Sequence, residues 1–115
     1  MKYLRSMVFI PLMCTVLNSN ATEVTSNPSV ARSEKLIRMV RQDCGSCHGM
    51  RLTGGLGPSL VPEVIQGKPI ETLTAIIYHG VIGTPMPGWK TMLTEADAQW
   101  IAENLLKGFP EEIKK

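Results

Sequence analysis

The chain has 115 residues, 43% of them hydrophobic, with 12 Lys or Arg against 10 Asp or Glu. A chain of this length is enough for a single small domain and offers only a modest core of its own. The near balance of charge, with no basic stripe along the sequence, argues against a nucleic acid partner.

The first 21 residues have the pattern of a secretory signal peptide. Lys2 and Arg5 give a basic start, Met7 to Leu17 is mostly apolar, and Ser19-Asn20-Ala21 supplies the small residues that a signal peptidase reads. The apolar stretch is too short for a convincing membrane span. We therefore predict cleavage after about Ala21, export to the periplasm, and no stable membrane insertion.

The expected cleavage defines the remaining boundaries. An uncleaved anchor and a lipid anchor on Cys14 are the alternatives, although the bulky residue before Cys14 does not suit a lipoprotein signal. Removing residues 1–21 takes away two basic side chains and no acidic one, which leaves 10 of each. We expect a polar, flexible lead-in over 22–27, one domain over 28–110 and a polar tail over 111–115.

A first helix is expected from Asn27-Pro28, a cap residue followed by a first-turn proline, almost to Cys44. Apolar residues recur at helical spacing along it, at Leu36, Ile37, Met39 and Val40. Its basic residues fall mostly on the other side, at Arg32, Lys35, Arg38 and Arg41. We interpret these charges as a solvated face.

The pentapeptide Cys44-Gly45-Ser46-Cys47-His48 has the spacing that attaches haem covalently. Each cysteine sulfur can bond one vinyl-derived carbon of the porphyrin, and the imidazole of the next residue then lies beneath the iron. We therefore predict one haem c bonded to Cys44 and Cys47, with His48 as the proximal iron ligand. A haem would also supply apolar core that so small a chain lacks.

Two other chemistries use a Cys-x-x-Cys pair. A structural zinc site needs four ligands, but the chain after residue 21 has no third cysteine and one further histidine. A thioredoxin-like redox pair belongs to a βαβ pattern, which this sequence lacks. Haem attachment is the better interpretation, and a haem-free redox or metal module stays open as an alternative.

The rest of the chain alternates between loops and helices. Glycine and proline crowd residues 49–58 and again 81–92, which we interpret as two loops. A helix opens at Pro69, and Thr94-Glu95-Ala96-Asp97 resembles a capping box that opens another. Each of these helices is expected to stop at a glycine, Gly80 and Gly108 respectively. Nothing alternates with period two, so the predicted fold class is all-α, with three to four helices around the haem.

The sequence also offers candidates for the group that orients His48 and for the ligand on the distal side of the iron. The free ring nitrogen of His48 needs an acceptor, and the carbonyl of Pro58 is one candidate, although this proline also suits an ordinary turn. Met86 lies between two prolines in a loop expected to cross the far face of the ring, so its thioether is the predicted distal ligand. Trp89 is expected to pack beside this loop, with a haem propionate as one candidate partner for its indole N–H.

Other residues compete less well for the iron. Met92 is the one real rival, because Met50 is too near His48 to reach the opposite face and Met39 is expected in the core. His79 ends a predicted helix, where an imidazole interacts well with the terminal carbonyls. It is a weaker rival ligand, and we assign it no role.

These features resemble class I c-type cytochromes over nearly all of the mature length. The shared pattern is an N-terminal helix, Cys44 to His48, Gly57-Pro58, Met86 and a C-terminal helix. A narrower resemblance is to the c-55X type, small cytochromes encoded with dissimilatory nitrite reductase in denitrifying bacteria. It is carried by three segments, 43–49, 52–58 and 84–87. The resemblance implies the class I cytochrome c fold, one haem c, and electron transfer in the periplasm.

The resemblance also implies partners. Members of the family are linked to electron supply for nitrite reductase or to maturation of its haem d1, and both roles stay open here. We expect a monomeric electron carrier and not an enzyme, with redox partner proteins such as nitrite reductase or its haem-maturation factors. The alternative is a haem enzyme or ligand sensor with an open sixth position, which would bind carbon monoxide or cyanide in its native state.

Overall fold

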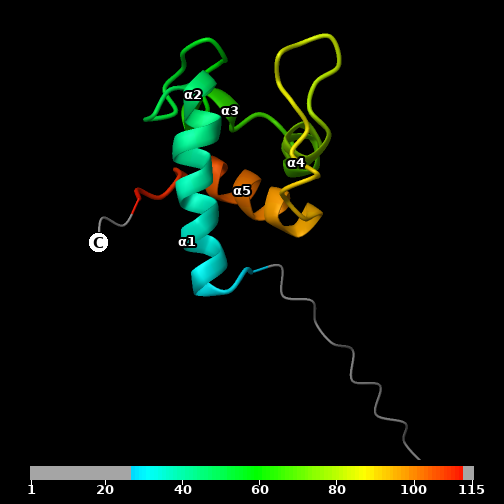
Figure 1. The fold of residues 1–115 in the computed structure, drawn as a ribbon. Helices are drawn as coiled ribbons and strands as arrows, with labels where there is room; N and C mark the ends of the chain where they lie inside the picture. The colour runs from blue at the N-terminus through cyan, green and yellow to red at the C-terminus, as the bar shows by residue number, and fades with distance from the viewer. Residues whose placement is uncertain (1–26, 113–115) are drawn as a thin grey trace, which may run out of the picture.

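The computed structural model describes residues 27–112, and every regular element in this part of the chain is a helix (Figure 1). This confirms the predicted all-α class. The expected signal peptide, residues 22–26 of the lead-in and residues 113–115 of the tail lie outside the described residues. None of the helices within 27–112 is long and apolar enough to cross a membrane.

Helix α1 (Val30–Met39) begins two residues later than the sequence suggested. Its N-cap is Ser29, whose hydroxyl accepts a hydrogen bond from the backbone N–H of Arg32 at 3.3 Å. A serine hydroxyl satisfies one of the unpaired N–H groups of the first turn. The prediction of a cap at Asn27 was therefore wrong, because the better-placed serine follows Pro28.

The first helix does not end before the cysteines. A π-helical turn, η1 (Val40–Cys44), follows α1 directly, and α2 (Gly45–His48) continues from it. The backbone N–H of Gly45 donates to the carbonyl of Val40, five residues back, which is the π-helical pattern. The chain is thus helical without a break from Val30 to His48, so the Cys-x-x-Cys-His segment extends the long first helix.

Two helices follow the first loop. A short α3 (Pro62–Ile65), which the sequence analysis missed, has a proline in its first turn. Helix α4 (Ile70–His79) takes Pro69 as its N-cap and ends at Gly80, which has a positive φ of 77°. The expected stop at Gly80 is confirmed, while Pro69 lies just outside the helix that it was expected to open.

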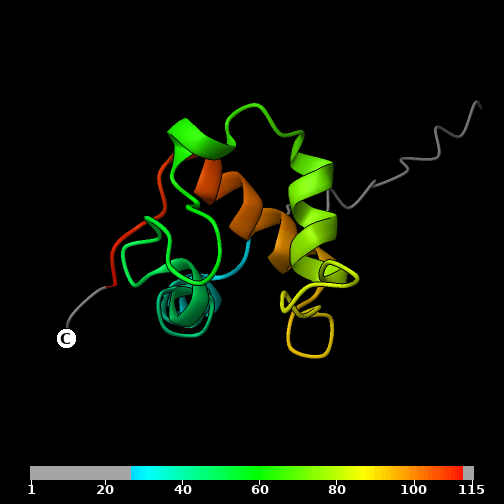
Figure 2. The ribbon, with the colours of Figure 1, turned by 90° about the horizontal axis from the view of Figure 1, so that it is seen from above.

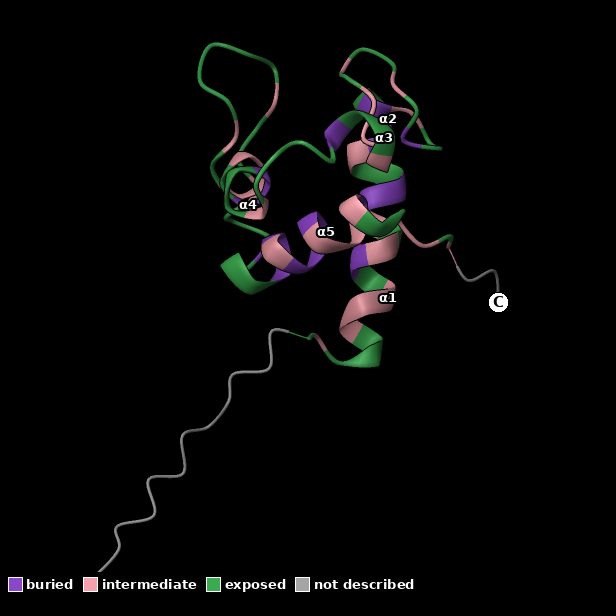
Figure 3. Ribbon diagram, turned by 180° about the vertical axis from the view of Figure 1, so that it is seen from behind, coloured by how far each residue is buried: buried purple, intermediate pink, exposed green. Residues whose placement is uncertain are grey.

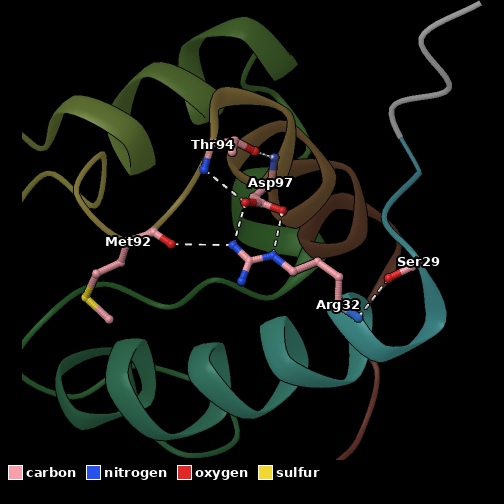
Figure 4. A network of polar contacts seen from close by, with 5 residues as sticks. All are labelled: Ser29, Arg32, Met92, Thr94 and Asp97. Carbon is pink, nitrogen blue, oxygen red and sulfur yellow. Dashed lines mark hydrogen bonds and ion pairs between the residues drawn. The ribbon is translucent and has the colours of Figure 1, made fainter.

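The last helix, α5 (Glu95–Lys107), begins with the predicted capping box. The Thr94 hydroxyl accepts from the Asp97 backbone N–H at 3.1 Å, and the Asp97 carboxylate accepts from the Thr94 backbone N–H at 2.9 Å. The same carboxylate accepts two hydrogen bonds from Arg32 in α1, so one side chain both starts α5 and joins it to α1 (Figure 4).

The helices pack around α5. In Figure 1 α5 passes behind α1, and Figure 2 shows α4 alongside its other end. The core lies where these helices meet and consists mainly of Leu36, Val40, Leu73, Trp100, Ile101 and Leu105. Figure 3 shows that buried residues are frequent on α5 and scarce on the two long loops, 49–60 and 80–92, at the top of the molecule.

The solvated basic face expected on the first helix is only partly present. Lys35 and Arg38 are exposed, as predicted. Arg32, by contrast, pairs with Asp97, and Arg41 is buried with only 6% of its surface exposed. The prediction was wrong for Arg41 because it assumed regular α-helical spacing, and the π-helical turn changes which side chains face inward from Val40 onward.

Candidate haem site

His48 ends α2 as a buried side chain with one ring nitrogen engaged. Its Nδ1–H donates to the carbonyl oxygen of Pro58 at 2.7 Å. Because a carbonyl can only accept, this contact assigns the proton to Nδ1 and leaves the lone pair on Nε2. The second ring nitrogen is thus available as a metal ligand, and the ring is held in one orientation.

Gly57 lets the loop close against His48. A Cβ atom at position 57 would lie 2.9 Å from Cε1 and Nδ1 of the His48 ring, closer than real side chains approach. The backbone N–H of Gly57 also donates to the carbonyl of Cys47 at 2.8 Å. The first loop therefore packs its backbone directly on the last two residues of the motif.

Other glycines make the same close approach. A Cβ at Gly49 would meet the carbonyl oxygen of Gly54 at 2.7 Å, and one at Gly55 would meet that of Cys47 at 2.8 Å. The Gly54 N–H donates to the carbonyl of His48 at 2.8 Å. The glycines of this loop thus allow two layers of backbone to touch, and this contact holds the backbone of Cys47 and His48 in place.

The two cysteines differ in their surroundings. Cys47 is exposed and Cys44 is half-buried, and neither forms a disulfide. Burial, assisted by the negative charge of Asp43, raises the pKa of the Cys44 thiol to about 11. A nucleophilic or zinc-binding cysteine needs a thiolate, which this site disfavours, whereas a thioether is neutral. The raised pKa of Cys44 therefore favours haem attachment over a haem-free redox or metal module.

Met86 lies in the second loop, which folds back onto the end of α4. The Met86 carbonyl accepts from the Val81 N–H at 3.2 Å, and the Met86 N–H donates to the Thr84 hydroxyl at 3.3 Å. A Cβ at Gly80 would meet the Met86 carbonyl oxygen at 2.7 Å, so the loop closes only over a glycine. The loop holds the Met86 backbone by local hydrogen bonds and one close contact.

Trp89 anchors the far end of this loop. Its backbone N–H donates to the carbonyl of Ile77 at 3.1 Å, and its ring packs against the core. The indole Nε1 is buried and is the one buried side-chain nitrogen or oxygen in the described part of the chain without a hydrogen-bond partner. A buried N–H is rarely left unpaired, so this atom calls for an acceptor such as a carboxylate.

The rival residues are less well placed. The Met92 side chain is exposed, as is that of Met50, and His79 is exposed with its ring edge-on to Tyr78 at 4.9 Å. Met39 packs against the core, as expected. The donor set therefore fits a haem: a buried imidazole with Nε2 free, two cysteines outside any disulfide in the same segment, and an unpaired buried N–H near the second loop.

Comparison with known proteins agrees with this reading. Residues 31–105 match the family model described as Cytochrome C oxidase, cbb3-type, subunit III. Cytochrome c55X of Paracoccus denitrificans (strain Pd 1222) is 51% identical over 86 residues, which cover 75% of this chain and 84% of that protein. The chain belongs to the cytochrome c55X family. As a c55X cytochrome it carries one covalently bound haem c, attached through Cys44 and Cys47.

Two solved structures extend the comparison. The c-type cytochrome NirC is 49% identical with a TM-score of 0.69, and the match covers 70% of this chain and 95% of that one. Dihydro-heme d1 dehydrogenase NirN in complex with DHE is 32% identical with a TM-score of 0.58, over 67% of this chain and 17% of that one. The c55X fold therefore resembles both a small free-standing cytochrome and one part of a much larger protein.

Sequence reasoning missed two parts of this c55X site. The contact of Gly57 with the His48 ring depends on how the loop closes, and composition marked only a flexible, glycine-rich stretch. Arg41 was assigned to the solvent, yet it lies buried three residues before Cys44. A buried arginine leaves no signal in a helical pattern that is read with the wrong period.

Proposed function

We propose that this cytochrome is a one-electron carrier whose iron is held by His48 and Met86. The observation that carries the proposal is the 2.7 Å contact between His48 Nδ1 and the Pro58 carbonyl, which leaves Nε2 as the ligating atom. A haem with two protein ligands cycles between ferrous and ferric iron without opening a position for substrate, and a thioether opposite histidine raises its reduction potential.

Each residue of the site has a role in this proposal. Cys44 and Cys47 fix the porphyrin to α2, so the cofactor cannot leave during repeated turnover. Gly57 and Pro58 keep the imidazole in one orientation, which limits the rearrangement that accompanies electron transfer. The Trp89 indole N–H donates to a propionate.

We further propose that the carrier works in the periplasm of a denitrifying cell, to or around dissimilatory nitrite reductase. The expected signal peptide supports the compartment. The likeness to dihydro-heme d1 dehydrogenase supports a place near haem d1 maturation. A dehydrogenase releases electrons from its substrate, and a one-electron carrier is a suitable class of acceptor for them.

Replacing the distal ligand tests the chemistry. Met86→Ala should lower the reduction potential and let carbon monoxide bind the ferrous iron. Met92→Ala is the matched control, since its side chain is exposed and should change neither property. A wild-type protein that binds carbon monoxide readily, or a Met86→Ala protein with an unchanged spectrum and potential, would reject the ligand pair in favour of an open sixth position.

Electron-transfer kinetics test the physiological role. The reduced cytochrome is mixed with purified nitrite reductase, and in a separate experiment the oxidised cytochrome is mixed with dihydro-heme d1 dehydrogenase and its substrate. Rapid transfer in the first experiment supports electron supply, and rapid reduction in the second supports cofactor maturation. Slow transfer in both would place the carrier outside nitrite reduction.

A further inference from the structure

Arg41 is a buried cation next to the haem-attachment segment. It lies within η1, three residues before Cys44, and only 6% of its surface is exposed. Its Nη1 donates to the carbonyl of Met50 at 3.3 Å, two residues after His48. Arg41 therefore precedes the motif in the chain, and its guanidinium contacts the backbone just after it.

The Met50 contact reaches the motif itself. The Met50 Cα would lie 3.3 Å from a Cβ placed on Gly45, so the backbone at 50 packs on the buried glycine between the two cysteines. Arg41 also holds the C-terminal segment in place: Nη2 donates to the carbonyls of Phe109 at 2.7 Å and Pro110 at 2.9 Å. Its guanidinium carbon stands 5.6 Å from the centre of the Phe109 ring.

The charge of Arg41 is poorly neutralised. Within residues 27–112 its one carboxylate partner is Glu111, with Nη2 and Oε1 3.3 Å apart. The Glu111 side chain is 88% exposed, so water and salt screen its negative charge. The other partners are carbonyl oxygens, which satisfy the N–H groups but carry no net charge. The site therefore keeps a net positive charge, and its burial shields that charge from solvent more than at a surface arginine.

We propose that Arg41 raises the reduction potential of the haem. Reduction is the addition of one electron to ferric iron, with no bond made or broken, and it lowers the charge of the centre by one. A fixed cation beside the attachment segment favours the less positive ferrous state. This inference rests on the redox-active haem of the proposed function and is independent of which partner the carrier serves.

The test is a set of potentiometric titrations of holo-cytochromes with chemical mediators. Arg41→Gln and Arg41→Met remove the charge in a polar and an apolar way, and each should lower the equilibrium constant for reduction about three- to tenfold, tenfold being about 59 mV for one electron. Arg38→Gln is the control, because Arg38 occupies the same helix and pairs with Glu112 in the open. Arg41→Lys keeps the charge and should stay nearer to wild type.

Two results would overturn the proposal. Potentials of Arg41→Gln and Arg41→Met that equal that of Arg38→Gln would show that the cation has no influence. An Arg41→Lys potential that falls as far as that of Arg41→Gln would make shape, and not charge, the cause. Spectra of the same samples test Met86 separately, because loss of that ligand changes the spin state of the iron.

A second pair of variants tests the effect of Arg41 on the potential if its replacement prevents formation of the holo-cytochrome. Glu111→Gln removes the carboxylate beside Arg41, and its high exposure makes it safe for folding. At low ionic strength it should raise the potential slightly, whereas Glu112→Gln, which frees Arg38, should leave it unchanged. A Glu111→Gln potential equal to or below that of Glu112→Gln would contradict the proposal.

Discussion

Arg32 and Asp97 form a two-pronged ion pair between the first and last helices, with Nη2 to Oδ2 at 2.6 Å and Nε to Oδ1 at 3.1 Å (Figure 4). The fork of a guanidinium matches the two oxygens of a carboxylate, so this pair also fixes the angle between the helices. Asp97 is buried and caps α5 at the same time, which gives one side chain two structural duties.

The ion pair predicts acid sensitivity. The hydrogen bonds from Arg32, together with those from Thr94, lower the pKa of Asp97 from 3.8 to about 2, against the opposing effect of burial. A carboxyl whose pKa is lower in the folded state stabilises the protein above its unfolded pKa, and loses that effect as the pH falls through the folded value. We expect about 2 kcal/mol of unfolding free energy to be lost between pH 4 and pH 2.

Denaturant unfolding at several pH values checks this expectation. Asp97→Asn should cost roughly 1–3 kcal/mol at pH 7 and flatten the loss between pH 4 and pH 2. Glu112→Gln breaks an exposed pair with Arg38 and should cost less than about 1 kcal/mol. Equal costs for the two variants would contradict the special role of Asp97.

Substitution of Gly57 should disturb the proximal histidine. In Gly57→Ala the new methyl group would lie 2.9 Å from the His48 ring, so either the ring or the loop must move. We expect a destabilisation of roughly 1–3 kcal/mol and an altered haem spectrum. Gly67→Ala is the matched control, because nothing lies within 4 Å of its added Cβ. Similar spectra and stabilities for both variants would show that the close contact at 57 is unimportant.

Alanine substitutions at two glycines of the second loop distinguish the effect of a steric clash from that of backbone strain. Gly80 and Gly83 both have positive φ, 77° and 79°, so alanine is strained at either position by about 1–2 kcal/mol. At Gly80 the methyl group would also lie 2.7 Å from the Met86 carbonyl oxygen, while Gly83 faces open space. We expect Gly80→Ala to weaken the proposed bond between the Met86 thioether and the iron, and so to admit carbon monoxide. Gly83→Ala should reduce stability but should not admit carbon monoxide. Carbon monoxide binding by both variants would argue that loop strain, and not the contact with Met86, controls whether Met86 stays bound.

The unpaired N–H of Trp89 predicts a measurable loss of stability in the holo-protein when this donor is removed. Trp89→Phe keeps an aromatic ring in the core but removes the buried donor. If this N–H donates to a propionate, the holo-protein should lose about 1–3 kcal/mol, the cost of leaving a charged acceptor with one partner fewer. Thermal or denaturant unfolding of the holo-protein measures it. A neutral or stabilising substitution would mean that the indole has no acceptor.

Features set by neighbouring residues could be predicted from the sequence. The Thr94 capping box and the stop at Gly80 each depend on fewer than six consecutive positions, and both occur as expected. The start of α1 was misplaced by two residues, because Asn27 and Ser29 are both good caps and local chemistry does not rank them.

Features set by distant residues were out of reach. Arg32 meets a carboxylate 65 positions away, and Arg41 meets carbonyls 68 and 69 positions away. Neither pairing is encoded in a local pattern, and both cations therefore looked like ordinary surface charges. The close fit of Gly57 on His48 is similar, since the eight intervening residues must first close into a loop.

The π-helical turn at Val40–Cys44 makes the site depend on chain length as well as on chemistry. The π-helical turn accommodates one extra residue, which sets the direction in which the cysteine side chains project from the long first helix. Deleting one residue of this turn, for instance the exposed Gln42, would leave every functional side chain in the sequence. It would still rotate Leu36 and Arg41 around the helix axis relative to the two haem-binding cysteines. Insertions and deletions here should therefore damage the site even when they spare every residue that attaches or binds the haem.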